Sequence, residues 1–202
     1  DVHKQAPTSL AALADKANQG KVVIPGFPDI QGLSLVMILD KVNGGGGVAS
    51  KFEKGIDAMA PIAPNVQTWE PKPDVYAPVV NGQATIGIGW NARSQANSDS
   101  SGGKLKAVIP SEGSAFQINT INLVKNAPQS AAAKTFINYA ISPAAQKAFT
   151  ESMFYGPTNS KAQIAEAAAA RTAVRSMDKM VPVDWIAVAK VRDAIGEQWR
   201  RK

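Results

Sequence analysis

The chain has 202 residues, which is long enough for a well-buried core and for one or two domains. Hydrophobic residues make up 45% and charged residues 19%, so the chain is too apolar for a disordered protein. No apolar run reaches the roughly 18 residues that a membrane-spanning helix needs. The 22 basic and 16 acidic residues give a net charge of +6, but basic and aromatic residues do not interleave, and we expect no nucleic-acid partner. The absence of cysteine excludes disulfides and cysteine-ligated metals.

The first part of the chain predicts short strands that alternate with helices. Thr8 and Ser9 can cap a helix that Gly20 ends, and residues 21–25 follow as a short apolar run typical of a buried strand. Further helices are expected at 33–42, 49–62 and 75–80, and a strand at 84–90, which leads into a loop.

The second part continues this alternation. A polar, glycine-containing loop is expected at 97–103, strands at 105–109 and 115–124, helices at 130–141 and 144–153, an alanine-rich helix from near 160, and a last helix at 184–200. Strands that alternate with helices predict the α/β class, with a sheet that is at least partly parallel.

Residues suited to catalysis are scarce. His3 is the only histidine, and a lone histidine near a terminus is more often exposed and idle than catalytic. The four glycines at 44–47 resemble a phosphate loop, but no Gly-Lys-Ser/Thr ending follows, and they come after a predicted helix. We interpret them as a turn. Because the acidic residues also show no paired spacing on a helix face, we expect no enzyme, no metal site and no cofactor.

Polar residues follow the first predicted strand, at the point where a helix begins. Ligands of open α/β sheets bind beyond the carboxyl ends of the strands. Asp29, Gln31 and Ser34 lie there, beside backbone amides that a helix leaves free. Two interpretations remain open, because Asp29 and Ser34 either contact an anionic ligand or merely cap the helix.

Other candidates lie at later strand ends and helix starts. Trp90 ends the strand at 84–90 and is either a core residue or the wall of a pocket. Gln117 and Asn119 share one face of the predicted strand at 115–124, where their amides need polar partners. Together we expect ligand contacts from Asp29, Gln31, Ser34, Trp90, Asn91, Gln117, Asn119, Tyr155, Asp184 and Trp185.

Several short motifs follow one another in an order that resembles a known protein family. They are Pro7-Thr8-Ser9-Leu10-Ala11-Ala12-Leu13, Gly82-Gln83-Ala84 before Ile88-Gly89-Trp90-Asn91, Ile109-Pro110-Ser111-Glu112-Gly113, the stretch 131–139, Ser142-Pro143, Tyr155-Gly156-Pro157-Thr158-Asn159 and Val183-Asp184-Trp185. Their order resembles the periplasmic substrate-binding proteins of ABC importers, and among these the spermidine/putrescine-binding group.

The resemblance implies a type II, periplasmic-binding-protein-like fold with two α/β lobes, a hinge and a ligand between the lobes. Residues 1–112 would form an intact second lobe, 113–180 a remnant of the first lobe after the hinge crossover, and 181–202 a C-terminal helix that packs back near the hinge. Members of the group have a first-lobe segment before the Pro-Thr-Ser motif, so we expect the N-terminal part of the first lobe to be missing here. Such a remnant would expose strand edges, and we expect it to associate with a complementary N-terminal fragment or with itself.

The resemblance also concerns the ligand. Trp90 matches a stacking tryptophan, and Asp29 matches one acidic residue of the polyamine binders. Gln117 and Asn119 stand where those proteins have a tryptophan and an aspartate. The cleft is therefore less acidic than a polyamine site, and we expect a small polar organic ligand with one amine group over Trp90.

The implied function is capture of this ligand in the periplasm and its delivery to an ABC transporter permease. The alternative is an enzyme or a sensory module on the same architecture. The chain opens on Asp1-Val2-His3-Lys4, so we expect no signal peptide within it.

Overall fold

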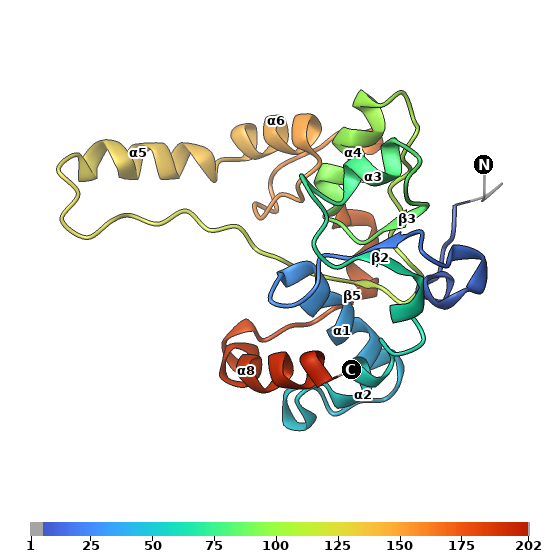
Figure 1. Cartoon of the computed structure of the whole chain (residues 1–202). Helices are drawn as coiled ribbons and strands as arrows, with labels where there is room; N and C mark the ends of the chain where they lie inside the picture. Colours follow the sequence, from blue (N-terminus) through green and yellow to red (C-terminus); the bar gives the residue numbers. More distant parts are fainter. Residues whose placement is uncertain (1–5, 202) are drawn as a thin grey trace.

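A three-stranded parallel sheet lies at the centre of the molecule (Figure 1). The computed structural model describes residues 6–201. Strand β1 (Val22–Val23) is fully buried between β2 (Val66–Thr68) and β3 (Ile86–Gly87), and Val22 pairs with Val66 on one side and with Ile86 on the other. A central strand of a parallel sheet is covered on both faces, which explains why β1 consists of valines.

Helix α1 (Ile30–Val42) follows β1 and is buried from Gly32 to Asp40. It begins at Asp29, whose carboxylate accepts the Gln31 backbone N–H at 2.7 Å. A Cβ atom at Gly32 would lie 2.4 Å from the Pro25 carbonyl oxygen, so only glycine lets the helix begin this close to the strand end. The helix is apolar on nearly all sides and is accordingly enclosed by other elements.

The main core forms where α2 (Glu53–Asp57) and α8 (Trp185–Arg201) pack beside α1. Leu35 of α1, Ile56 of α2 and Ile195 of α8 contribute to this core, and each is at least 98% buried. A loop that includes the turn Gly47–Ser50 joins α1 to α2. The C-terminal helix α8 therefore stabilises the same body as the sheet, rather than extending away from it.

A second, smaller core lies on the other side of the sheet, beside α3 (Tyr76–Val80) and α4 (Asn91–Ser100). It consists of Val23, Val75, Tyr76, Ala84 and Leu105. Shorter helical turns complete this body at Leu10–Ala14, Lys16–Asn18, Ala63–Asn65 and Ala173–Lys179.

Two parallel strands, β4 (Ser114–Ala115) and β5 (Met180–Val181), pair where the chain leaves and re-enters the main body. Between them lie α5 (Ser130–Ala140), α6 (Pro143–Met153) and α7 (Glu166–Ala169). Figure 1 shows that residues 116–129 run outward as extended chain and that α5 lies far from the sheet. We call residues 116–153 the arm. Its exposed apolar residues are Ile118, Ile121, Leu123, Val124, Phe136, Tyr139, Ile141, Phe149 and Met153.

Several expectations about secondary structure are wrong in detail. The helix expected at 49–62 is broken, because Lys51 and Phe52 adopt left-handed backbone conformations. The loop expected at 97–103 is helical as far as Ser100, in α4. No strand forms at 105–109, and the strand expected at 115–124 is reduced to β4, because no described chain segment lies beside the rest of it.

Other expectations agree with the structure. Helices α5, α6 and α8 lie within about two residues of their expected bounds, and α1 begins three residues earlier than expected. Strands β2 and β5 were not expected from the sequence. Within residues 6–201, no helix combines the length and the apolar character needed to cross a membrane.

Candidate functional site

An open cleft of about 2140 Å³ lies beside the end of β3. Its walls come from the first turns of α1 and α4, the crossover after β4, the residues that follow α6, and the apolar faces of the arm. A pocket for a small ligand usually measures about 300–1,000 Å³. The cleft is larger because the space beside the arm is continuous with it.

Seven of the ten residues expected to contact a ligand line this cleft. Their ligand contacts remain a prediction, but the fold brings them to one place from four separate segments. They are Gln31, Ser34, Trp90, Asn91, Gln117, Asn119 and Tyr155.

The other three expected residues do not line the cleft. Asp29 caps α1, and Asp184 accepts the backbone N–H groups of Ile186 and Ala187 at 3.0 Å each, at the start of α8. The Trp185 indole N–H donates to the Phe116 carbonyl oxygen at 3.0 Å, and its ring packs against the main core. For these residues the structure favours capping and packing, because their polar atoms already have partners inside the protein.

Trp90 lies at the junction of β3 and α4. Its backbone N–H donates to the Tyr76 hydroxyl at 2.9 Å, and that hydroxyl lies 3.4 Å from the Trp90 carbonyl oxygen. A Cβ atom at Gly89 would lie 2.7 Å from the Tyr76 ring. The tyrosine ring therefore packs directly against the backbone just before Trp90. The Trp90 side chain itself is half-buried and borders the cleft, which favours a pocket wall over a core residue.

Tyr76 is a buried, neutral hydrogen-bonding group. Burial raises the pKa of its phenol above the ordinary value, while the hydrogen bond to Trp90 and the positive charge of Arg93 offset part of that rise. At neutral pH the hydroxyl therefore keeps its proton and stays available to both backbone groups of Trp90.

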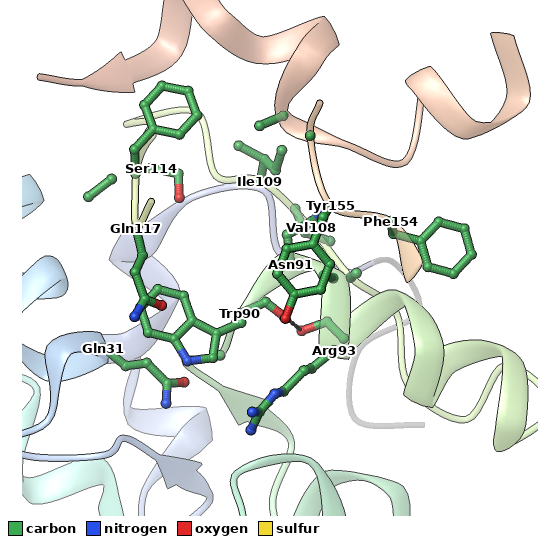
Figure 2. Close-up of a pocket in the computed structure, with 18 of the residues that line it drawn as sticks. Gln31, Trp90, Asn91, Arg93, Val108, Ile109, Ser114, Gln117, Phe154 and Tyr155 are labelled. Atoms are coloured by element: carbon green, nitrogen blue, oxygen red, sulfur yellow. Dashed lines mark hydrogen bonds between the residues drawn. The ribbon is translucent and has the colours of Figure 1, made fainter. Parts of the chain in front are cut away.

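The side chains beside Trp90 are mostly amides and hydroxyls. In Figure 2, Gln31, Trp90 and Gln117 point toward the same part of the cleft, and the Arg93 guanidinium extends toward it from α4. Two polar atoms from α1, the Gln31 Oε1 and the Ser34 Oγ, are buried without a hydrogen-bond partner among the described residues. The described lining contains the positive side chains of Arg93, Lys104 and Lys106 and no aspartate or glutamate.

A group of contacts joins the cleft wall to the chain that follows α6. The Asn91 amide donates to the Arg171 carbonyl oxygen at 2.8 Å. The Arg171 guanidinium bonds Gln95 and Asp99 of α4 and lies 3.9 Å from the centre of the Phe154 ring. These contacts fix α4 relative to the segment that carries Tyr155.

Sequence reasoning missed Tyr76, Arg93 and Arg171. Tyr76 lies in an apolar stretch, and only the packing of α3 on β3 reveals the use of its hydroxyl. Arg93 carried a weak signal, since it follows Trp90 by three positions in a segment without acidic residues. Nothing local marked Arg171, because its partners lie more than 70 positions earlier in the chain.

Metal ligands do not gather in this part of the protein. Across the described range 6–201, no three histidine, aspartate or glutamate side chains lie close enough to hold a metal ion. His3, considered above as a catalytic residue, lies outside the described residues.

Similarities to known proteins agree with this fold. An ABC transporter protein from Clostridium perfringens matches 98% of this chain with 23% identity and a TM-score of 0.77. An extracellular solute-binding protein from Bordetella parapertussis matches 98% of it with 26% identity and a TM-score of 0.76. The chain covers 62% of the length of each. These are type II periplasmic-binding-protein-like structures, so the expected fold class is confirmed.

Sequence similarity leads to the same family. The gamma-aminobutyric acid-binding protein of Pseudomonas aeruginosa is 32% identical over 113 residues, which are 56% of this chain and 30% of that protein. The chain thus spans less than a third of this relative. The family model for the bacterial extracellular solute-binding proteins matches residues 1–175. This match covers most of the chain, which therefore belongs to the family of bacterial extracellular solute-binding proteins.

Proposed function

We propose that this chain captures a small polar organic ligand in the cleft beside Trp90 and delivers it, outside the cytoplasm, to the permease of an ABC importer. The observation that carries this proposal is the convergence of seven polar and aromatic side chains on one cleft. Gln31, Ser34, Trp90 and Asn91 come from the starts of helices that follow parallel strands, where α/β sheets bind ligands. The other three come from the chain after β4 and after α6. Membership of the solute-binding family supports the transport role.

The ligand that fits best is a small amino acid with separated amine and carboxylate groups. The similarity to a gamma-aminobutyric acid-binding protein supports this class. A polyamine fits less well, because the described lining offers no carboxylate to balance several ammonium groups. The amine would lie over the Trp90 ring, where a cation is attracted to the π-system.

The two-lobed organisation belongs to the same proposal. Residues 1–112 would be the second lobe, 113–180 part of the first lobe, and 181–202 the helix that packs back near the hinge. The paired strands β4 and β5 would be the hinge, since the chain passes from the main body to the arm and back there. The exposed apolar residues of the arm would be covered by a complementary segment of the first lobe or by a second copy of the chain.

The competing class is an enzyme or sensory module, and nothing in the cleft favours it. Its described lining contains no histidine, and its charged groups are one arginine and two lysines, with no carboxylate to act as a general base.

Titration calorimetry with γ-aminobutyrate, putrescine and glucose tests the proposal on the full chain. We expect saturable binding of γ-aminobutyrate, weaker binding of putrescine and none of glucose, with the ligand recovered chemically unchanged by NMR. Conversion of the ligand during incubation would favour the enzyme. Absence of binding by γ-aminobutyrate and putrescine, with no small molecule retained in native mass spectrometry, would overturn the proposal.

A further inference from the structure

The charged groups that border the cleft are all of one sign. Arg93, Lys104 and Lys106 lie in its wall, and no acidic side chain of the described residues does. Within residues 6–201, none of these three cations forms an ion pair with a carboxylate. The cleft therefore presents a positive potential that the described protein does not neutralise.

Arg93 stands where the helix itself disfavours a cation. It is the third residue of α4, a helix of ten residues, and the N-terminal end of a helix carries a partial positive charge. The first turn of α4 has no acidic residue, and the preceding Trp90 provides no side-chain cap. The charge of Arg93 and the partial positive charge of the free amides in this turn have the same sign and add together. This arrangement suits an incoming anion.

A second, independent observation comes from α1. Ser34 is 8% exposed, lines the same cleft, and its hydroxyl has no hydrogen-bond partner among the described residues. The side-chain oxygen of Gln31, one turn earlier, is buried without a partner as well. Buried polar groups are nearly always paired in folded proteins, so orphaned groups at a cleft wall point to a partner that comes from outside the chain.

Figure 2 shows Gln31 and Arg93 on either side of one space, and Ser34 lines the same cleft. The Gln31 amide and the Arg93 guanidinium extend toward the same side of the Trp90 ring, from α1 and α4 respectively. A serine hydroxyl can donate to an oxygen anion, and an arginine fork matches the two oxygens of a carboxylate. The unpaired Gln31 Oε1 is an acceptor, so the group that satisfies it is a donor such as an ammonium.

We propose that Arg93 and Ser34 form a subsite for an anionic group of the ligand, a carboxylate in particular, and that this group is required for binding. The inference rests on the proposed solute-binding function and makes it narrower. The anion supplies the negative charge that the cleft lacks, whereas an amine would lie over the face of Trp90 and could donate to the Gln31 Oε1.

Three four-carbon probes separate the contributions: butyrate has only the anion, n-butylamine only the cation, and γ-aminobutyrate both. We expect calorimetry at low ionic strength to give saturable binding of butyrate and γ-aminobutyrate, with n-butylamine at least tenfold weaker. The Arg93→Gln variant should lose at least tenfold in affinity for both carboxylates. The Arg200→Gln variant, which removes one charge from the exposed end of α8, should match the unaltered chain.

Ser34→Ala gives a readout that a purely structural serine would not. Since the hydroxyl has no internal partner, the variant should unfold at the same temperature as the unaltered chain, or higher, and bind butyrate several-fold more weakly. A loss of stability with unchanged affinity would overturn its part in the subsite.

The outcomes also separate this inference from the function on which it rests. If n-butylamine binds as tightly as butyrate, or if Arg93→Gln binds butyrate unchanged, the anion subsite is wrong while ligand capture stands. If none of the three probes binds but native mass spectrometry finds another retained small molecule, the subsite is again wrong and capture stands. If no small molecule is retained at all, the proposed function fails first.

Discussion

The hydroxyl of Tyr76 holds both backbone polar groups of Trp90, accepting its N–H at 2.9 Å and lying 3.4 Å from its carbonyl oxygen. Tyr76 is 4% exposed and comes from α3, fourteen positions earlier in the chain. The orientation of the cleft tryptophan is therefore set by a residue that does not itself need to touch a ligand.

Tyr76→Phe should both destabilise the chain and weaken ligand binding. The variant keeps the ring in the smaller core but leaves the Trp90 N–H without its partner, which costs about 1–3 kcal/mol of unfolding free energy. Chemical denaturation measures the loss, and the shift of tryptophan fluorescence reports the freed Trp90. Tyr139→Phe, on the exposed surface of α5, is the matched control for stability and should leave the unfolding free energy unchanged. Equal losses in both variants would contradict this role of Tyr76.

Trp90→Ala should reduce affinity more than stability. A pocket wall loses stacking worth about 0.5–2 kcal/mol, whereas truncation of a core tryptophan costs about 3–5 kcal/mol of unfolding free energy. Melting curves with and without γ-aminobutyrate separate the two. Trp69→Ala is the comparison, since its ring lies 5.2 Å from that of Trp199 against the main core and should report stability alone. A melting temperature that falls as far for Trp90→Ala would support the core interpretation.

Glu112 should make the fold sensitive to acid. Burial raises the pKa of its carboxyl, but hydrogen bonds from Ser9, Ser111 and the Leu10 backbone outweigh this and lower the pKa below its ordinary value. A lowered pKa contributes stability above the unfolded-state value, near 4.3, and this contribution is lost as the pH falls through the lower folded-state value.

Urea denaturation between pH 7 and pH 3 tests this dependence. Glu112→Gln should flatten the part of the stability profile below about pH 4.5. Glu70→Gln, an exposed residue, should leave the profile unchanged. A profile that keeps its slope in Glu112→Gln would assign the acid sensitivity to another carboxyl group.

Asp40→Ala should be among the most destabilising single changes in the chain. Asp40 is 1% exposed, and its two carboxylate oxygens accept the backbone N–H groups of Gly47 at 2.9 Å and Gly55 at 3.1 Å. Removal leaves the buried Gly55 N–H unpaired, at about 1–3 kcal/mol of unfolding free energy, and also removes the partner of the half-buried Gly47 N–H. Asp193→Ala, on the exposed side of α8, provides the baseline in the same denaturation experiment. A loss below about 1 kcal/mol would show that water or a neighbour replaces the carboxylate.

The arm should cause the isolated chain to associate. Phe136 is 62% exposed on α5, and eight other large apolar side chains of the arm are exposed as well. Exposed apolar surface of this extent usually marks an interaction face. Light scattering should show species larger than a monomer at micromolar concentration, and Phe136→Ser should reduce their amount. Lys134→Ser, on the same helix, should not; a monomer at all concentrations would remove the need for a covering partner.

Local sequence signals predicted the elements that local forces stabilise. The break before α6 was predicted from Ser142-Pro143, and in the structure Ser142 caps the helix and Pro143 fits its first turn. Helix α8 was predicted from its apolar spacing. By contrast, the alternation at 115–124 is typical of a strand, but a strand exists only where a second one pairs with it. The left-handed Lys51 and Phe52 also had no signal, because that conformation usually belongs to glycine.

The residues of the candidate site likewise fall into those that the sequence could predict and those that only the fold reveals. Trp90 and Asn91 were identified because ligands bind at the carboxyl ends of strands in an open sheet, a rule of topology that needs no coordinates. Gln117 and Asn119 were identified from a strand that did not form over most of its expected length, yet both line the cleft. Asp29 caps α1, as its alternative interpretation had it, and Asp184 caps α8, an alternative that was not considered for it. The positive character of the cleft depends on which charges the fold brings to its wall, and the sequence shows only their number.

The backbone amides of the extended chain from Gln117 to Leu123 can report which partner covers this part of the arm. Its backbone amides donate to no described residue, so their protons should exchange with deuterium almost as fast as in a free peptide. Successive amides of an extended chain point to opposite edges. A partner strand along one edge would slow exchange at every second residue, and partners along both edges would slow it at all of them. The pattern of slowed amides would therefore show whether a partner strand pairs with one edge of this extended chain or with both.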